Sequence, residues 1–345
     1  MRHFILAGAF MLACLGTASA EDCKPLQMLG SADVAVQDGE VFANVVINGK
    51  PAKMLVSTAG GTTGFTPQGV TALGLDTIAD SRVILINSKS ESSESYVVID
   101  DLSVGGAHIA HSQYMVLPTS GAGNADTDVV GVIGPDLLSH FDVELDFGAG
   151  KMNLFSQDHC PGKVIYWKHV AVSVVPLSKF QPTSNNSRTG YQGYMKRFEQ
   201  MWVPVTLDGK DLPAQISTSG VSNMESNTAL GAFNVDASSP GSVPSSNPLA
   251  TPGIFQHKFS ALVFDGVTVT NPNFLVYPFH PAKFTRQFKR TDTRLARLDD
   301  GDPASIVVGM DVLTRLHLFA SFGEHRLFIT EASGPPKPAS AGGTQ

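Results

Sequence analysis

The sequence predicts an all-β protein built from two homologous lobes. The chain has 345 residues, of which only 16% are charged, together with 33 Gly and 21 Pro. This composition is typical of structures rich in strands and turns rather than of helical bundles. The length is sufficient for two domains of average size. In addition, the second half of the chain repeats motifs of the first half.

The charge balance and hydrophobic content exclude several classes of protein. Hydrophobic residues make up 42% of the chain, which argues against a disordered or fibrous protein. The chain has 24 Lys and Arg against 31 Asp and Glu, a net charge of −7. An acidic chain of this kind is a poor match for duplex nucleic acid, so we expect no nucleic-acid partner.

The first twenty residues have the pattern of a secretory signal peptide. Residues 1–3 form a short basic start, residues 4–15 are apolar, and residues 18–20 read Ala-Ser-Ala, a small-residue cleavage site. We expect cleavage after Ala20. An alternative is a lipoprotein cleavage box that ends at Cys14, which would leave a very short apolar region. No later stretch is long and apolar enough to predict a transmembrane segment. The prediction is therefore a periplasmic or secreted monomer.

Two cysteines, Cys23 and Cys160, remain after removal of the signal peptide. An even pair in an exported chain predicts a disulfide, because the compartment is oxidising. The alternative is two unpaired thiols. No group of His and Cys has the spacing of metal ligands, so we expect neither a metal nor a cofactor.

The internal repeat has a constant offset of 160 residues over most of its length. Residues 42–60 read FANVVINGKPAKMLVSTAG, and residues 202–220 read WVPVTLDGKDLPAQISTSG. The same offset relates residues 102–106 to 262–266 and residues 114–118 to 274–278. Residues 134–138 match 309–313 at an offset of 175, which places an insertion of 15 residues between Phe279 and Asp302.

The repeat divides the chain into an N-terminal lobe (residues 21–160), a connection (161–194), a C-terminal lobe (195–332) and a tail (333–345). Within the connection, the apolar run 164–175 predicts a strand shared between the lobes, and the Ser- and Asn-rich run 179–193 predicts an exposed loop. The tail is rich in Gly, Pro, Ser and Ala, which predicts disorder.

Short apolar runs bounded by Asn-Gly and Asp-Gly turns predict that both lobes are mostly β. Each Gly-x-Asp-x-Leu segment is expected to be the short helix of its lobe. Asp136 and Asp311 lie in these segments at positions where an N-cap would satisfy free backbone N–H groups. We interpret both acids as structural.

The repeated blocks resemble the aspartic proteases, in particular the exported bacterial relatives of the retroviral proteases. In that family each lobe has an apolar strand that runs into Asp-Thr-Gly, and later two apolar residues and a Gly that open a helix. Residues 131–155 and 307–329 are similar to the lobe endings of the family. The resemblance implies a cleft between the lobes, covered by flaps at residues 87–96 and 237–253. An extended peptide would bind there through backbone hydrogen bonds.

The sequence departs from this family at the residues that carry the chemistry. Where the family has Asp-Thr-Gly, this chain has Ser57-Thr58-Ala59 and Ser217-Thr218-Ser219. Aspartic proteolysis needs two carboxylates that share one proton, and a serine hydroxyl has no comparable acidity near neutral pH. The resemblance implies that the two threonines hydrogen-bond across the junction of the lobes. It places the following residues at the cleft and lobe junction: Thr58, Ala59, Gly60, Thr218, Ser219 and Gly220.

Three further groups of residues are possible replacements for the missing acids. A serine nucleophile needs an adjacent base, and the repeat places no His or Lys beside Ser57 or Ser217. His108, His111 and His140 are expected on later strands and the helix of the first lobe, in surface or structural roles. Asp126 and Asp128 precede the Gly134 helix and could lie near the cleft. They have no partners at the matching place in the second lobe, so we interpret them as a polar loop.

The insertion at residues 279–302 is locally basic. Its cationic residues are Lys283, Arg286, Lys289, Arg290, Arg294 and Arg297, and they alternate with Phe and Leu. It could meet an acidic partner or an anionic surface. Alternatively, it could form a solvated short helix that packs its apolar side on the second lobe.

Three functions follow from these observations. The leading prediction is a catalytically inactive pseudoprotease that binds an extended peptide or protein between its lobes. The alternatives are an active aspartic-type endopeptidase and a structural envelope protein.

Overall fold

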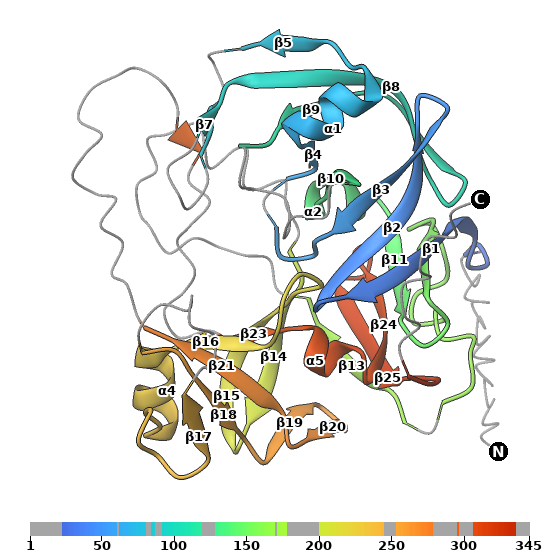
Figure 1. Ribbon diagram of the computed structural model, residues 1–345. Helices are drawn as coiled ribbons and strands as arrows, with labels where there is room; N and C mark the ends of the chain where they lie inside the picture. The colour runs from blue at the N-terminus through green and yellow to red at the C-terminus, as the bar shows by residue number, and fades with distance from the viewer. Residues whose placement is uncertain are drawn as a thin grey trace, which may run out of the picture.

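The two lobes lie one above the other in Figure 1, which shows a computed structural model. It describes residues 23–60, 62–80, 84–86, 92–118, 128–169, 171–177, 200–244, 253–278, 295–296 and 306–335, with the backbone alone at 84–86 and 295–296. The predicted signal peptide, the loop 179–193 and nearly all of the basic insertion lie outside these residues. No helix in the described part of the chain is long and apolar enough to cross a membrane.

The first lobe is a barrel. Its ring of strands runs β2-β3-β10-β4-β9-β8 and closes through pairing of β8 with β2. The elements of the first half of the chain are β1 (Met28–Gln37), β2 (Glu40–Ile47), β3 (Lys50–Val56), β4 (Gly64–Phe65), α1 (Pro67–Leu73), β5 (Thr77–Ala79), β6 (Ile84–Ile86), β7 (Ser92–Ser93), β8 (Ser95–Val104), β9 (Ala107–Val116), β10 (Val129–Ile133), α2 (Pro135–Leu138), β11 (Asp142–Asp146) and β12 (Lys151–Phe155).

The second lobe repeats this order of strands. Its sheet runs β17-β18-β21-β16-β23-β15-β14-β19-β20. The elements of the second half are β13 (Ser173–Pro176), β14 (Trp202–Leu207), β15 (Lys210–Ile216), β16 (Asn223–Glu225), α4 (Ser226–Phe233), β17 (Ser242–Pro244), β18 (Phe255–Lys258), β19 (Ala261–Phe264), β20 (Val267–Thr270), β21 (Asn273–Tyr277), β22 (Leu295–Ala296), β23 (Ile306–Val308), α5 (Met310–Leu313), β24 (Leu316–Ser321) and β25 (Arg326–Glu331).

The repeat in the sequence is also a repeat of strand register. Val46 pairs with Ser103 in the first lobe, and Thr206 pairs with Val263 in the second, both at the offset of 160. The ring of the second lobe is interrupted where the long strand β8 is replaced by the two short strands β18 and β19. The predicted all-β, two-lobed architecture is therefore confirmed.

Equivalent tight turns fix this register. The turn between β2 and β3 has Asn48 and Gly49 at φ of 48° and 79°, and the turn between β14 and β15 has Asp208 and Gly209 at 43° and 78°. Two consecutive residues with positive φ match the right-handed twist of a hairpin, and Asn-Gly and Asp-Gly tolerate this conformation best.

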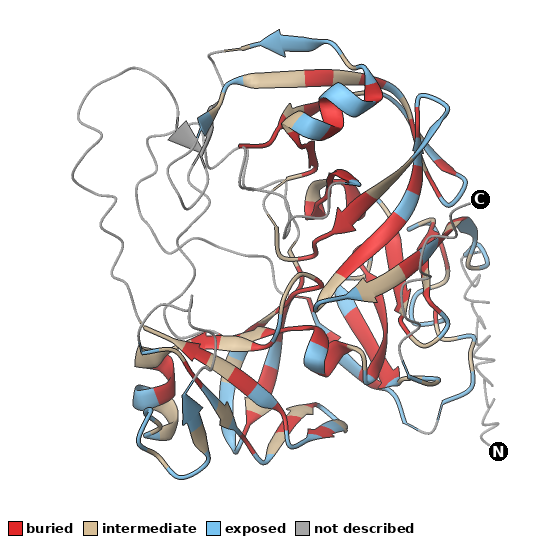
Figure 2. Cartoon of the chain, viewed as in Figure 1, coloured by how far each residue is buried: buried red, intermediate tan, exposed pale blue. Residues whose placement is uncertain are grey.

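A second sheet joins the lobes. Its strands run β13-β25-β24-β11-β12-β1, and the antiparallel pairing of β11 with β24 sets Val143 opposite Ala320 and Asp146 opposite His317. β24 is buried along its whole length (Figure 2). β13 lies at the edge of this sheet, so a strand shared between the lobes is present, but only at Ser173–Pro176. The other described residues of the predicted run 164–175 are not in a strand.

Two further features hold distant parts of the chain together. The predicted disulfide between Cys23 and Cys160 is present, with Cα atoms 4.8 Å apart. In a loop-entropy description, closing a loop of this length contributes up to about 5 kcal/mol. In addition, β22 runs parallel to β6, which pairs with β7 in a small sheet, so residues 295–296 lie beside the first lobe. Buried apolar side chains of both lobes form one continuous core.

Candidate functional site at the lobe junction

Two equivalent loops meet at the centre of the molecule. Ser57 follows the last residue of β3, and Ser217 follows the last residue of β15. The N–H of Ser57 donates to the carbonyl of Ile133 at 2.9 Å, and the N–H of Ser217 donates to the carbonyl of Val308 at the same distance. Each serine is therefore held by the strand that leads into the short helix of its own lobe.

Glycine is required where each loop passes over the start of that helix. A Cβ added at Gly134 would lie 2.6 Å from the carbonyl carbon of Thr62, and one added at Gly309 would lie 2.3 Å from that of Val221. Because real Cβ atoms do not approach backbone this closely, the apolar-apolar-Gly pattern reflects the close crossing of two chain segments.

The two acids in the Gly-x-Asp-x-Leu segments bond to the crossing loops, and Asp136 also accepts from the N–H of Leu137 in the first turn of its helix, at 3.0 Å. Asp136 accepts from the N–H and the hydroxyl of Thr63 at 2.7 and 2.6 Å, and Asp311 accepts from the N–H of Ser222 at 2.6 Å. The prediction that these acids are N-caps is wrong, since the N-cap residues are the two crossing glycines. Each acid is the second helical residue, two positions beyond the N-cap, and from there its carboxylate reaches the loop that crosses the start of the helix.

Thr58 and Thr218 form a reciprocal set of hydrogen bonds across the lobe boundary. The hydroxyl of Thr58 donates to the carbonyl of Ile216 and accepts from the N–H of Thr218, at 2.6 and 3.2 Å. The hydroxyl of Thr218 donates to the carbonyl of Val56 and accepts from the N–H of Thr58, at 2.6 and 3.1 Å. Both threonines are fully buried, so these four bonds lock the two loops together in a pseudo-twofold arrangement.

A cluster of three serine hydroxyls lies beside these threonines. Ser219 Oγ is 3.1 Å from Ser57 Oγ and 3.5 Å from Ser217 Oγ, and Ser217 also donates to the carbonyl of Ser219 at 3.0 Å. Ser57 and Ser217 are only 5% and 4% exposed. Ala59, the counterpart of Ser219 in the first lobe, has no hydroxyl, so the symmetry is broken at this position. We call Ser57, Ser217 and Ser219 the hydroxyl cluster.

The cluster can donate and accept hydrogen bonds, but hydroxyl groups do not ionise near neutral pH. Among the described residues, no carboxylate, His or Lys forms a hydrogen bond with any of its three hydroxyls. The geometry therefore offers a polar binding surface in which, among the described residues, none of the three hydroxyls donates a hydrogen bond to a base.

Two glutamines that sequence reasoning missed hold the first-lobe loop from the opposite side. Gln200 donates to the carbonyls of Ala59 and Gly60 at 3.1 and 3.2 Å, and Gln215 donates to the side-chain oxygen of Gln200 at 3.0 Å. In the repeat, Gln200 corresponds to Glu40. The signal in the sequence that could have identified Gln200 is that it differs in charge from Glu40, the equivalent residue of the first lobe.

A pocket of about 320 Å³ lies in the first lobe, next to the loop that follows Ser57. Its lining is mostly polar: Thr62, Thr63, Asp80, Glu94, Ser95, Tyr96, Gln113, Tyr114, Met115 and Asp136. Burial raises the pKa of Tyr114 to about 12, so this tyrosine stays neutral. Ser95 and Tyr96 belong to the segment predicted as the first flap, of which residues 87–91 lie outside the described residues.

The remaining candidates lie away from the junction. His108 and His111 are exposed on β9, where they pair with Asp101 and Asp100. His140 is exposed after α2, and Asp128 is exposed before β10. Asp126 lies outside the described residues, as do residues 245–252 of the second predicted flap. No group of three or more His, Cys, Asp and Glu within the described ranges could hold a metal ion.

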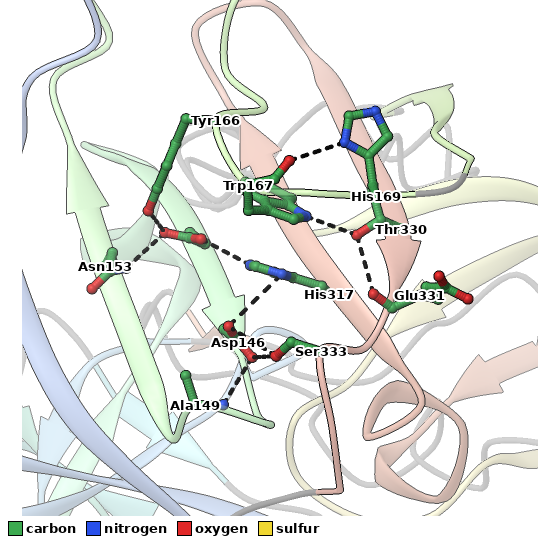
Figure 3. A network of polar contacts seen from close by, with 11 residues as sticks. Asp146, Ala149, Asn153, Tyr166, Trp167, His169, His317, Thr330, Glu331 and Ser333 are labelled. Carbon is green, nitrogen blue, oxygen red and sulfur yellow. Dashed lines mark hydrogen bonds and ion pairs between the residues drawn. The ribbon is translucent and has the colours of Figure 1, made fainter.

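A second polar cluster lies on the sheet that joins the lobes (Figure 3). Glu144 on β11 is 2.8 Å from Nε2 of His317 on β24, and it accepts from Tyr166 and Asn153, each at 2.6 Å. His317 also lies 3.8 Å from Asp146. Glu144 and His317 are each 3% exposed. Burial and the hydrogen bond to Glu144 raise the pKa of Tyr166 above its ordinary value.

A similar pair lies further along the same face of β11. Asp142 is 2.6 Å from Nε2 of His159 and accepts from the hydroxyl of Ser321 at 2.6 Å. Burial lowers the pKa of His159, but the hydrogen bonds to Asp142 and to the Cys160 carbonyl, together with the charges of Asp142 and Glu324, outweigh it. The pKa of His159 is therefore raised.

Residues 43–137 match the protein family described as aspartyl protease. The chain has the two-lobed fold of an aspartic protease. Its structure is similar to that of the aspartic proteinase from Irpex lacteus, with a TM-score of 0.51 and 11% identity over 88% of this chain and 97% of that one. A search of curated protein sequences finds no match.

Two further structures show weaker likeness to this aspartic-protease fold. The protein edgp aligns with a TM-score of 0.49 and 10% identity, over 90% of this chain and 96% of that chain. A retropepsin-like aspartic protease from Rickettsia conorii aligns with a TM-score of 0.29 and 18% identity, over 37% of this chain and 91% of that chain.

Proposed function

We propose that this protein binds an extended peptide or protein segment in the cleft between its two lobes and leaves the peptide bonds intact. Ser57 and Ser217 take the positions of the two catalytic aspartates of the family. The protein acts as an exported monomer without a cofactor. The disulfide supports such a location, because disulfides persist in oxidising compartments.

The hydroxyl cluster carries this proposal. Aspartic proteolysis needs one ionised and one protonated carboxyl group close together, so that water is activated while the carbonyl is protonated. The side chains at the centre of this junction are instead serines that bond to one another. They can hold a peptide carbonyl or N–H, but they cannot exchange protons as the two carboxyl groups do.

The preserved architecture supports binding. The four bonds of Thr58 and Thr218 keep the loops in register, while Ala59, Gly60, Ser219 and Gly220 remain partly exposed. Exposed backbone where the two lobes meet is suited to an extended chain, which would bind through main-chain hydrogen bonds and place alternate side chains in pockets. The pocket beside Thr62 has room for one such side chain.

A cleavage and binding experiment tests this proposal. Residues 21–345 are incubated with a diverse peptide library between pH 3 and 8, and products and retained peptides are identified by mass spectrometry. Three matched variants serve as controls: Ser57→Ala with Ser217→Ala, Ser219→Ala, and Thr71→Ala at an exposed helical position. We expect retained peptides, no cleavage above the controls, and a thermal shift that grows with ligand concentration over Kd.

Other outcomes would establish a different function. Cleavage that is lost in the serine variants would demonstrate a serine-dependent peptidase. Cleavage that persists in all variants and co-purifies with the protein would favour an endopeptidase with acids elsewhere in the cleft. Neither binding nor cleavage, together with partition into envelope material, would favour a structural protein.

A further inference from the structure

One acidic side chain shares a face with the hydroxyl cluster. Glu40, the first residue of β2, forms an isolated antiparallel bridge with Ser219. On either side of this bridge, the N–H of Val41 donates to the carbonyl of Thr218 at 3.1 Å, and the N–H of Gly220 donates to the carbonyl of Gly39 at 2.8 Å. Glu40 and Ser219 are therefore the non-hydrogen-bonded pair between two hydrogen-bonded positions.

This pairing fixes the direction of the Glu40 side chain. Residues opposite each other at such a position project to the same side, with Cβ atoms about 4.5–5.5 Å apart. The Ser219 hydroxyl contacts Ser57 and Ser217. The Glu40 carboxyl group therefore projects on the side of the hydroxyl cluster, from the first lobe toward the second-lobe loop.

The environment of Glu40 disfavours its charge. The residue is half-buried, and burial, with a smaller contribution from the charge of Asp38, raises the pKa of Glu40. Within the described ranges, no Lys, Arg or His forms an ion pair with it. A half-buried carboxylate without a cation is stabilised when a ligand supplies one.

The opposite side of the junction differs in this respect. Gln200, which the repeat aligns with Glu40, uses its amide fully, with the carbonyls of Ala59 and Gly60 as acceptors and Trp202 and Gln215 as donors. Only one of the two equivalent positions therefore offers charge to a ligand.

We propose that Glu40 and the hydroxyl cluster form a subsite for a primary ammonium group, supplied by a lysine side chain of the bound segment. An ammonium has three donors, which match one carboxylate and two hydroxyl oxygens. This inference rests on the proposed function, since it names the side chain that the cleft selects.

The test uses a set of synthetic peptides. Octapeptides of Ala and Thr, blocked at both ends, carry a single lysine that is moved through all eight positions. A matched set carries norleucine, which lacks the ammonium, and a third set carries arginine. Kd is measured by calorimetry for the unaltered protein, for Glu40→Gln, and for Glu331→Gln as a control at an exposed site on β25.

We expect one lysine position to bind at least about tenfold more tightly than norleucine, because a charge-assisted hydrogen bond is worth more than a neutral one. Glu40→Gln removes this preference, and Glu331→Gln retains it. The preference grows as pH is raised through the Glu40 pKa, which lies above 4.5, because only the ionised carboxylate attracts the ammonium. Carboxyl NMR of the complex shows the pKa of Glu40 falling on addition of the lysine peptide.

Four results would overturn the subsite. Equal affinity for lysine and norleucine at every position, or a lysine preference that survives Glu40→Gln, would do so while leaving peptide binding intact. A preference for arginine over lysine would show that the subsite selects a guanidinium rather than an ammonium group. Failure of every peptide to bind the unaltered protein would overturn the proposed function itself, and the subsite with it.

Discussion

The two lobes meet in two places that treat carboxylates in opposite ways. At the central junction, neutral hydroxyls bond to one another and two threonines tie the loops together. On the sheet that joins β11 and β24, Asp142 and Glu144 are buried, and each is paired with a histidine. Buried acids are therefore retained in this fold where a histidine and neutral hydrogen-bond donors surround them.

This difference accounts for the serines at positions 57 and 217 better than a general intolerance of buried charge would. The β11 carboxylates each accept at least two hydrogen bonds from neutral donors in addition to a histidine. Among the described residues, no histidine forms a hydrogen bond with the hydroxyl cluster. Two carboxylates there would repel each other, and one alone would be left without a partner.

The largest expected effect is the loss of an acid from the sheet. Glu144→Ala removes the partner of His317, Tyr166 and Asn153 at once. We expect the free energy of unfolding to fall by about 3–5 kcal/mol, as when one member of a buried ion pair is removed. Denaturant unfolding measures it, with Glu331→Ala as an exposed control. A loss below about 1 kcal/mol would mean that this pair does not hold the lobes together.

A slightly smaller effect is expected at the junction. Thr58→Val keeps the shape of the side chain but leaves the Ile216 carbonyl and the Thr218 N–H without their partner. At about 1–2 kcal/mol for each of the two unsatisfied groups, the lower part of the usual range, we expect a loss of about 2–4 kcal/mol. Thr218→Val should cost the same by symmetry, and Thr71→Val, at an exposed position, should cost less than about 0.5 kcal/mol. Markedly unequal losses for the two junction variants would contradict the pseudo-twofold description.

Introducing acids at the two serine positions tests directly whether the central junction tolerates carboxylates as the β11–β24 sheet does. Ser57→Asp with Ser217→Asp places two carboxylates beside Ser219. Because like charges repel, we expect the double variant to lose about 2 kcal/mol more than the sum of the single variants at pH 7, and little extra at pH 3. Denaturant melts at both pH values measure this. New peptide cleavage by the double variant, absent in each single variant, would show that the carboxylates alone were missing.

The smallest effect concerns pH. The pKa of His159 is raised in the folded protein, chiefly because its bonds to Asp142 and Cys160 and the nearby charges outweigh burial. Its stabilising contribution is complete below the unfolded pKa of about 6.5 and is lost as pH rises through the higher folded value. We expect His159→Gln to flatten the decline in stability above pH 6.5. An unchanged slope would contradict the assignment of this decline to His159.

The sequence was sufficient to predict what depends on local pattern and on the repeat. The lobes follow from the repeat, the turns at Asn48 and Asp208 from their Asn-Gly and Asp-Gly pairs, and the Cys23–Cys160 disulfide from the even pair of cysteines in a chain with an export signal. The N-cap assignment of Asp136 failed because the helix already begins at Pro135, so that Gly134 is the N-cap and Asp136 lies within the first turn.

The features that could not be predicted depend on pairing between distant segments. The position of Glu40 opposite Ser219 follows from a strand register between lobes, which no local pattern encodes. Likewise, His317 meets Glu144 only because β24 pairs with β11 in one particular register. The Gln200 contacts with Ala59 and Gly60 also cross from one lobe to the other.

The pairing of β11 with β24 also sets an order of events during folding. Every strand of the first barrel, and both cysteines, come from the first half of the chain, so this barrel and its disulfide can form while the second half is still being synthesised. β11 then presents an unpaired edge until β24 arrives near the end of the chain. Contacts of such long range close slowly, and open edges invite aggregation. The half-made protein is therefore the form that most needs a chaperone.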